Sequence, residues 1–264
     1  MKLSTDKMLA EKDGTIGWMT FNNPERHNAV SLEMWDAADE ILRDFAADDA
    51  VRVVVLAGAG GKAFVSGADI SKFEKERSGE DSVRHYNDRV RRAYDNVQAL
   101  PKPTIAMVDG YCIGGGLALA VCCDLRFCSE KSRFGLPAAK LGLGYPFEGL
   151  NRLVATVGPG AARDITFSGR QLDAQEALDI GLVQKVLAGD ELEDFVVGYA
   201  KTVAANAPLT VKAMKVIINE VLKNPDAPDL DKCRALVDEA FASEDFAEGR
   251  RAFMEKREPR FKGR

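Results

Sequence analysis

Residues 102–127 decide the fold class and read KPTIAMVDGYCIGGGLALAVCCDLRF. The apolar run at 104–108 predicts a buried strand, because strands that are covered on both faces are hydrophobic throughout. A glycine triplet at 114–116 follows and opens an apolar helix at 117–123. Glycine permits a tight turn and lets a ligand approach backbone N–H groups. The stretch therefore predicts a strand-to-helix turn that presents the unpaired N–H groups of a helix N-terminus.

A second glycine turn lies upstream, in the segment KAFVSGADI at residues 62–70. It follows another apolar run at 51–57, which also predicts a buried strand. Two N–H donors from separate turns that converge on one oxygen would form an oxyanion hole, and each would contribute about 3 kcal/mol of transition-state stabilisation. A dinucleotide site is disfavoured, because the glycine triplet lacks the GxGxxG spacing and the acidic residue about 20 positions later.

The chain as a whole divides into two parts. Up to about residue 150, strand and helix patterns alternate, which indicates crossover units and a mostly parallel sheet. From there the pattern is nearly all helical. We assign residues 1–200 to an α/β core and residues 201–264 to a helical C-terminal region. Because this region is too thin to form an independent domain, we expect it to pack on a partner subunit.

Composition and charge limit the possible partners and location. The chain has 264 residues, of which 46% are hydrophobic, so it can form a large core. Its net charge of −5 disfavours nucleic acid and anionic membranes as partners. The N-terminal segment has no apolar signal core, and no apolar run approaches the roughly 20 residues that cross a bilayer. We therefore expect a cytoplasmic protein without a membrane or nucleic-acid partner.

Cysteine and histidine usage argues against a metal site. The two histidines, His27 and His85, are too few for a multi-histidine site. The cysteine count is odd and no CxxC pair occurs, so we expect buried free thiols in a reducing compartment. The five cysteines are Cys112, Cys122, Cys123, Cys128 and Cys233.

Taken together, five segments resemble the crotonase superfamily, the enoyl-CoA hydratase/isomerase family. They are KAFVSGADI at 62–70, the stretch at 102–127, FGLPAAKLGLGYP at 134–146, SGRQLDAQEALDIGLVQKV at 168–186 and EGRRAFMEKREPRFKGR at 248–264. The resemblance implies an α/β fold of the ClpP/crotonase type, with repeated ββα units, two roughly perpendicular sheets and a C-terminal helical trimerisation region. It also implies a homotrimer or dimer of trimers that acts on an acyl-CoA thioester. Coenzyme A would then enter as part of the substrate, and we expect no separate cofactor.

The resemblance also assigns roles to individual residues. Ala68 matches the first oxyanion-hole donor and Gly115 the second, and both would act through backbone N–H groups. The other matching positions, which would contact the acyl-CoA, are Arg26, His27, Ala29, Ser66, Asp69, Ile70, Phe253 and Lys256, the last two reaching the CoA of a neighbouring subunit. Three of these have alternatives from the residues alone. Asp69 is also suited to cap a following helix, Arg26 to be solvated, and His27 to be a surface or packing residue.

Two positions depart from the hydratase pattern. Hydratase members hold and activate water with two glutamates, and the matching residues here are Ala118 and Ala138. A methyl group neither accepts nor donates a proton, whereas general acid–base catalysis typically supplies 10²–10⁴-fold in rate. The sequence thus predicts that the enolate-stabilising donors are kept while the water-activating pair is lost.

Residues 141–148, LGLGYPFE, contain the remaining candidates for chemistry. They resemble the methylmalonyl-CoA decarboxylase members, with a tyrosine at Tyr145 that could orient a carboxylate or guide reprotonation. We therefore favour decarboxylation of a malonyl-CoA-type thioester, in which loss of CO₂ generates the enolate without a base. One alternative is weak hydratase or isomerase activity that uses Glu148, Tyr145 or water; another is a non-catalytic acyl-CoA-binding subunit. Tyr145 could also simply line the pocket, and Glu148 could be an exposed loop residue.

Overall fold

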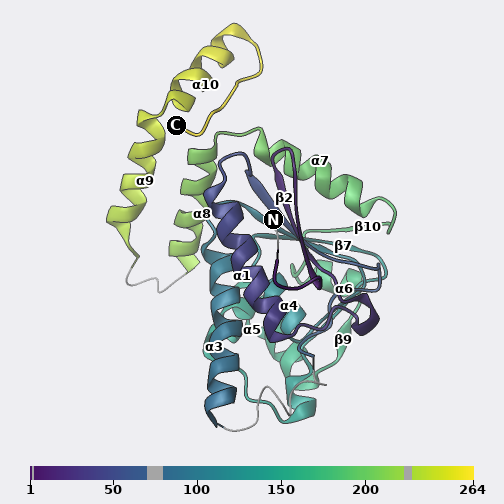
Figure 1. The fold of residues 1–264 in the computed structure, drawn as a ribbon. Coiled ribbons are helices and arrows are strands. Elements are labelled where there is room, and N and C mark those ends of the chain that lie inside the picture. The colour runs from purple at the N-terminus through teal and green to yellow at the C-terminus, as the bar shows by residue number, and fades with distance from the viewer. Residues whose placement is uncertain (2, 70–79, 223–227) are drawn as a thin grey trace.

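The computed structural model of the chain describes residues 1, 3–69, 80–222 and 228–264 (Figure 1). In these residues a larger and a smaller sheet are surrounded by helices, and three further helices extend from the body towards the C-terminus. The architecture is the α/β arrangement with two sheets that the sequence predicts.

The larger sheet places its strands in chain order. In the described part of the chain it has six strands in the order β1-β2-β3-β5-β7-β10, of which β1 and β2 form an antiparallel hairpin and the others pair in parallel. The central strand β3 has the sequence VVVLAG and is buried along nearly its whole length, as expected for a strand covered on both faces. The bounds are Met8–Asp13, Ile16–Phe21, Val53–Gly58, Thr104–Val108, Leu125–Ser129 and Lys185–Leu187.

The smaller sheet consists of very short strands in the order β4-β6-β8-β9. Their bounds are Ala63–Val65, Tyr111–Ile113, Arg133–Gly135 and Gln171–Leu172. The first three pair in parallel, and β9 pairs with β8 in antiparallel orientation. Because β4 and β6 end just before the two glycine turns, this small sheet sets the distance between those turns.

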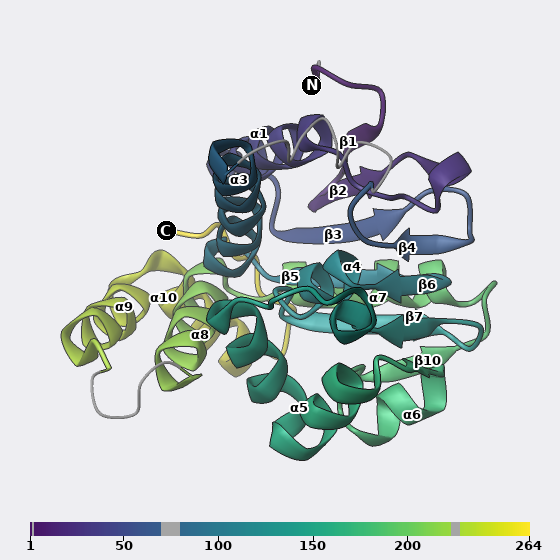
Figure 2. The same cartoon turned by 90° about the horizontal axis from the view of Figure 1, so that it is seen from below.

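Helices cover both faces of the larger sheet. On one face α7 (Leu192–Ala204) packs its buried Leu192, Val196 and Ala200 against strand residues such as Val53 and Val55. On the other face lies the main core, which includes the buried side of α1 (Leu32–Ala47). The buried α1 residues follow the helical period along one face and include Met34, Trp35, Ala38, Ile41, Leu42 and Phe45. Helix α3 (Glu80–Ala99) packs alongside α1 (Figure 2).

Helix α4 (Gly115–Ala120) is held close to the small sheet by its glycines. Gly114 has φ +58° and ψ −114°, a backbone conformation that residues with a Cβ rarely adopt. This conformation lets the chain turn into the helix. A Cβ on Gly116 would lie 1.9 Å from the carbonyl oxygen of Val65, so only glycine permits α4 to approach β4 this closely. The first turn of α4 is therefore locked against the strand that leads into the other glycine turn.

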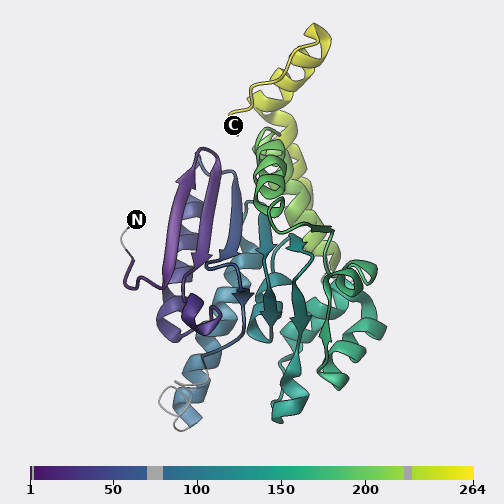
Figure 3. The ribbon, with the colours of Figure 1, turned by 90° about the vertical axis from the view of Figure 1, so that its right-hand side faces the viewer.

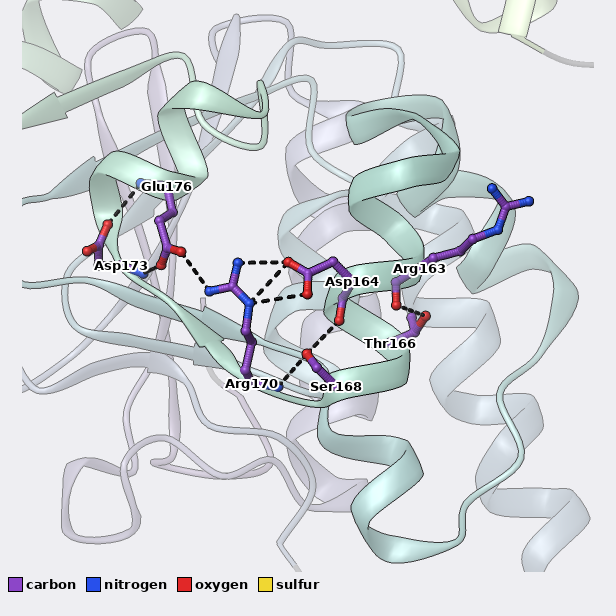
Figure 4. A network of polar contacts seen from close by, with 7 residues as sticks. All are labelled: Arg163, Asp164, Thr166, Ser168, Arg170, Asp173 and Glu176. Carbon is purple, nitrogen blue, oxygen red and sulfur yellow. Dashed lines mark hydrogen bonds and ion pairs between the residues drawn. The ribbon is translucent and has the colours of Figure 1, made fainter.

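The segment after α4 brings two helices around the small sheet. Helix α5 (Phe147–Ser168) contains a break at Gly158, so that Pro159 begins its second half, a position that suits proline. Between α5 and α6 (Ala174–Asp179), Arg170 forms ion pairs with Asp164 at 2.7 Å and Glu176 at 2.6 Å (Figure 4). Asp173 and Glu176 complete a capping box at the start of α6. This exposed network fixes the α5–α6 connection and has no contact with the glycine turns.

Of the C-terminal helices, α8 (Pro208–Leu222) lies against the body, and α9 (Leu230–Ala242) and α10 (Glu244–Glu255) extend away from the sheets (Figure 3). Helix α8 is anchored by the buried Lys215, whose ammonium donates to the carbonyl of Lys102 at 2.9 Å and pairs with Asp124 at 2.8 Å. Arg52 donates to the carbonyls of Ala204 and Phe261, which joins the body to the end of the chain. Many apolar side chains of these helices are exposed.

The cysteine prediction is confirmed for most of the set. Cys112, Cys122, Cys123 and Cys128 are free and buried, while Cys233 on α9 is free and half-buried. In the described residues there is no cluster of three or more His, Cys, Asp or Glu side chains that could hold a metal ion. None of the helices in that part of the chain is long and apolar enough to span a bilayer.

Candidate active site

The two glycine turns place the backbone of Ala68 beside the start of α4. Val30 makes both hydrogen bonds of a parallel bridge, donating to Gly67 O at 2.9 Å and accepting from Asp69 N at 3.0 Å. Because these bonds use the residues on either side of Ala68, the N–H of Ala68 itself points to the opposite side. That side faces α4, since a Cβ on Gly115 would lie 3.9 Å from Ala68 N and 3.7 Å from Gly67 Cα.

Both predicted donors are available. Gly115 is the first residue of α4, so its N–H has no partner within the helix. In the part of the chain that the structure describes, neither Ala68 N nor Gly115 N donates a hydrogen bond to any acceptor. Two adjacent, unpaired N–H groups, one at a helix N-terminus, are suited to hold an oxygen that gains negative charge. The structure thus brings together the pair that the sequence predicts for the oxyanion hole.

One face of helix α4 extends from the N–H group of Gly115 along the helix. Gly115, Ala118 and Cys122 are spaced three and four residues apart and therefore share a face of the helix. Ala118 is buried, and the Cys122 thiol donates to its carbonyl at 3.1 Å. Ala138 lies half-buried in a short 3-10 helix (Pro137–Leu141) and packs against the same core. Ala118 and Ala138, where the resemblance predicts that two glutamates are lost, thus carry methyl groups in largely apolar surroundings.

Two tyrosines supply hydroxyl groups near this face. Tyr94 on α3 donates a hydrogen bond from Oη to the carbonyl of Gly115 at 3.0 Å. Burial raises the pKa of the Tyr94 phenol well above its usual range, and the neighbouring Tyr145 and Cys122 raise it further. The pKa of Tyr145 is raised as well, chiefly by burial. Both phenols are therefore neutral at physiological pH and act as hydrogen-bond donors or weak acids.

Arg152 on α5 supplies a positive charge beside the phenols. Its side chain is 11% exposed, donates from Nε to Gln98 at 2.8 Å and forms an ion pair with Asp95. Its charge favours the ionised forms of Tyr94 and Tyr145, although burial outweighs this effect on both pKa values. Sequence reasoning missed Tyr94, which lies in a polar, charge-rich helical stretch, and Arg152, which lies in a mostly apolar one. Only the packing of α3 and α5 on α4 reveals them.

The position of Glu148 differs from that of the tyrosines. It lies in the first turn of α5 and its side chain is exposed, next to Phe147, which is 78% exposed. Tyr145 packs against the same segment, since a Cβ on Gly149 would lie 2.6 Å from its ring. The Glu148 carboxylate is therefore exposed to water, whereas the Tyr145 ring is partly buried and packs against the hydrophobic core.

The predicted CoA-binding loop lies against the first glycine turn. Ser66 donates from its backbone N to His27 O at 3.1 Å and from Oγ to Arg26 O at 3.4 Å. Arg26 and His27 are exposed, and Ala29 is half-buried. The loop is held by Asn28, which is fully buried and donates to Ala63 O at 2.7 Å. Asn28 was not predicted from the sequence, although its left-handed backbone conformation suits asparagine.

The remaining predicted contacts lie elsewhere. Asp69 is nearly buried and favours the charged form of Lys7. Ile70 lies outside the described residues, as does the helix that Asp69 could cap. Phe253 and Lys256 are exposed at the end of α10, on the helices that extend away from the sheets (Figure 1). A cavity of about 910 Å³ also lies in this region, between α10 and the final residues, and it is lined by charged side chains such as Glu248 and Arg257.

Comparison with known proteins agrees with this arrangement. A family model described as enoyl-CoA hydratase/isomerase matches residues 11–264. The chain belongs to the enoyl-CoA hydratase/isomerase family. The crotonase fold expected from the resemblance is thereby confirmed.

Relatives of this family cover nearly the whole chain. The short-chain-enoyl-CoA hydratase of Clostridium acetobutylicum is 35% identical over 97% of this chain and 97% of its own length. The probable enoyl-CoA hydratase of Rhizobium meliloti is 37% identical over 99% of this chain and all of its own length. The crystal structure of an enoyl-CoA hydratase/carnithine racemase from Magnetospirillum magneticum has a TM-score of 0.92 at 37% identity and covers 99% of this chain and 97% of that chain.

Proposed function

We propose that this member of the family binds an acyl-CoA thioester, holds its carbonyl oxygen between Ala68 N and Gly115 N, and decarboxylates a malonyl-CoA-type acyl group. The observation that carries the proposal is the chemistry of the α4 face. Its neighbouring groups are unpaired N–H donors and neutral phenols, with methyl groups at Ala118 and Ala138. The site can therefore stabilise an enolate but has no carboxylate at the usual positions to begin the reaction by removing a proton.

Decarboxylation suits such a site because it forms the enolate without a base. The bond between the α-carbon and the carboxylate breaks, its electron pair moves into the thioester enolate, and CO₂ leaves. The two N–H donors stabilise the negative charge that develops on the thioester oxygen, each by about 3 kcal/mol. The apolar surroundings of Ala118 and Leu117 disfavour a charged carboxylate in the ground state and thereby assist its loss.

The CoA part of the substrate would lie along the loop that contacts Ser66. Arg26 and His27 are exposed there, and the guanidinium of Arg26 is suited to a phosphate group. Ala29, Asp69 and Ile70 stay predicted contacts, as do Phe253 and Lys256 from a neighbouring subunit. Coenzyme A would be part of the substrate, so the proposed reaction uses no separate cofactor.

The direct test measures CO₂ release from methylmalonyl-CoA and malonyl-CoA, with binding of acetyl-CoA measured in parallel. The proposal expects turnover that greatly exceeds the rate of crotonyl-CoA hydration by the same preparation. Tight binding of acetyl-CoA without release of CO₂ from either thioester would overturn it, and would instead favour a non-catalytic acyl-CoA-binding subunit.

A second candidate is hydration or isomerisation of an enoyl-CoA, because similar proteins are named short-chain-enoyl-CoA hydratase and crotonyl-CoA hydratase. It requires a base other than the missing pair, and Glu148 is the carboxylate nearest to Tyr145 in the sequence. Crotonyl-CoA hydration by the Glu148→Gln and Tyr145→Phe variants separates the possibilities. Loss of hydration in Glu148→Gln alone would assign the base to that carboxylate, and loss in Tyr145→Phe alone would assign it to the phenol.

We also propose that the chain assembles as a homotrimer or a dimer of trimers. The support is the large number of exposed apolar side chains on α8, α9 and α10, far more than a monomer surface of this size commonly gathers in one region. They include Met214, Ile218, Val221, Leu222, Leu230, Val237, Phe241, Phe246, Phe253 and Met254. A neighbouring subunit that covers these side chains would also bring Phe253 and Lys256 of one chain towards another.

A further inference from the structure

The first turn of α4 has a hydroxyl group directly above it. The Tyr94 Oη that donates to the Gly115 carbonyl at 3.0 Å would lie only 3.1 Å from a Cβ built on Gly115. Gly115 is the residue whose N–H forms half of the predicted oxyanion hole. The phenol of α3 therefore lies against the same residue that would hold the thioester oxygen.

This position places the hydroxyl close to the reacting carbon of a bound thioester. The α-carbon is only two bonds from the oxygen that Ala68 N and Gly115 N would hold. A carbon this near to the two donors lies within reach of Gly115, and Tyr94 Oη is only 3.1 Å from the position that a Cβ on Gly115 would take. The phenol ring is fixed from behind by Trp35, in an edge-to-face contact with ring centroids 5.3 Å apart. A fixed ring holds Oη in one place, and rotation about the C–O bond turns the O–H from Gly115 O towards one face of the α-carbon for proton transfer.

We propose that Tyr94 is the acid that protonates the α-carbon of the enolate, an inference that rests on the function proposed above. The Tyr94 O–H bond breaks, a C–H bond forms at the α-carbon with the enolate electron pair, and the thioester carbonyl is restored. The resulting phenolate takes a proton from water, and the hydroxide formed leaves to solvent. The proton consumed by decarboxylation is thus supplied by water through Tyr94.

The surroundings of Tyr94 suit an acid rather than a base. Burial keeps the phenol neutral, so it has a proton to give, and a thioester enolate is a much stronger base than a phenolate. The charge of Arg152 favours the ionised form of Tyr94 and so stabilises the transient phenolate. Tyr145 feels the same charge but packs against Gly149 of its own segment. The hydrogen bond to Gly115 distinguishes Tyr94 from it.

The stereochemistry of the product tests this role. Methylmalonyl-CoA decarboxylated in D₂O gives propionyl-CoA with deuterium at the α-carbon, and a fixed acid delivers it to one face. We expect one predominant enantiomer from the unchanged protein and from the control Tyr199→Phe, which alters a tyrosine on the opposite face of the larger sheet. We expect racemic product from Tyr94→Phe, with kcat lowered about 10²-fold. A single enantiomer from Tyr94→Phe, or racemic product from Tyr145→Phe alone, would overturn the proposal.

A second measurement needs neither turnover nor a variant. In a crystal structure with a non-cleavable propionyl-CoA analogue, we expect Tyr94 Oη at about 3–3.5 Å from the α-carbon. A phenol that is separated from this carbon by another side chain would rule out the assignment. If the unchanged protein releases no CO₂ but shows this contact, the decarboxylase proposal fails while the placement of Tyr94 stands.

Discussion

The guanidinium of Arg126 donates a hydrogen bond to the carbonyl of Cys123 at 2.7 Å, so a residue of strand β7 closes the C-terminal end of the segment that begins at Gly115. The same side chain donates from Nε to Leu182 O at 2.6 Å and is almost fully buried. Burial lowers the pKa of Arg126 from its usual value, and the nearby carbonyls compensate for the charge that is removed from water. This one side chain connects the end of the segment after α4, the larger sheet and the turn that precedes β10.

Replacing Arg126 with methionine should destabilise the fold by about 3 kcal/mol, because two buried carbonyls lose their donors. Arg126→Lys should recover only part of this, since a lysine does not reach both carbonyls with the fixed geometry of a guanidinium. Urea unfolding measures both. The control is Arg43→Met, which removes an exposed pair with Asp39 and should change stability by at most about 0.5 kcal/mol. Equal stabilities for the Arg126 and Arg43 variants would contradict this view of the core.

Gly116→Ala should abolish most acyl-CoA turnover. Its Cβ would overlap the carbonyl of Val65, so β4 or α4 must shift and the two N–H donors would separate. Loss of one aligned donor typically lowers kcat by 10²–10³. The control is Gly198→Ala on α7, where no atom lies within 4 Å of the added Cβ, and which should stabilise the helix by about 0.5–1 kcal/mol. Undiminished turnover by a folded Gly116→Ala variant would show that donor spacing does not limit the reaction.

Introducing the missing carboxylates should change the reaction. The double variant Ala118→Glu/Ala138→Glu should hydrate crotonyl-CoA at least about 10²-fold faster than the unchanged chain, because general acid–base catalysis becomes available. The rate of decarboxylation should fall, because a carboxylate beside Tyr94 disfavours the negative charge that forms on the enolate and then on the Tyr94 phenolate. Ala139→Glu serves as the control, because Ala139 is the exposed neighbour of Ala138. Hydration that is already rapid in the unchanged chain would contradict the predicted loss of the acid–base pair.

Acid should remove the contribution of Glu248 in the C-terminal tail to the stability of the fold. Hydrogen bonds from Arg257, and from the backbone of Arg260, lower the pKa of Glu248 from 4.5 to about 2. A carboxyl group with a lowered pKa stabilises the fold fully above its unfolded value and loses this contribution as the pH falls towards about 2. The difference in stability between the unchanged chain and Glu248→Gln should therefore be constant at neutral pH and vanish between pH 4.5 and 2. Urea unfolding across this range measures it, with the exposed Asp231→Asn as control.

Disrupting the exposed apolar stripe of α8 should dissociate the assembly. Met214, Ile218 and Val221 are each more than half exposed and share one side of the helix. Met214→Glu/Ile218→Glu should therefore shift the chain to a monomer in sedimentation measurements without unfolding it. Leu9→Glu on the edge strand β1 changes an exposed leucine elsewhere and should leave the assembly intact. An unchanged particle mass in the α8 variant would place the subunit interface on another surface.

The long elements of the fold could be predicted from the sequence because each carries its own pattern. The run at 104–108 coincides with β5, and the expected helix at 230–242 with α9. The short strands could not be predicted this way. β4, β6 and β9 contain two or three residues each, which is too few for an alternating pattern. The last strand, Lys185–Leu187, is equally short, and the buried Leu182 and Val183 lie in the turn before it.

The residues of the candidate site also divide into those that could be predicted from the sequence and those that could not. The two glycine turns could be predicted because they leave a signature in the sequence, and the resemblance to the family then assigned Ala68 and Gly115 within them as the donors. Tyr94 could not, because its role comes from α3 packing against α4 across more than 20 residues of chain. Asn28 was overlooked for a similar reason, since its carbonyl partners belong to β4 and the turn before it. Contacts between distant segments depend on the assembled fold.

The strand order described above has a consequence for synthesis on the ribosome. In both sheets, each strand lies beside one that precedes it in the chain, except where a sheet begins. A growing chain can therefore add strands in the order in which they emerge, each docking on an edge that already exists, and no early strand has to wait exposed for a partner far downstream. The N-terminal hairpin of β1 and β2, whose contacts are local, is suited to be the nucleus of this vectorial folding.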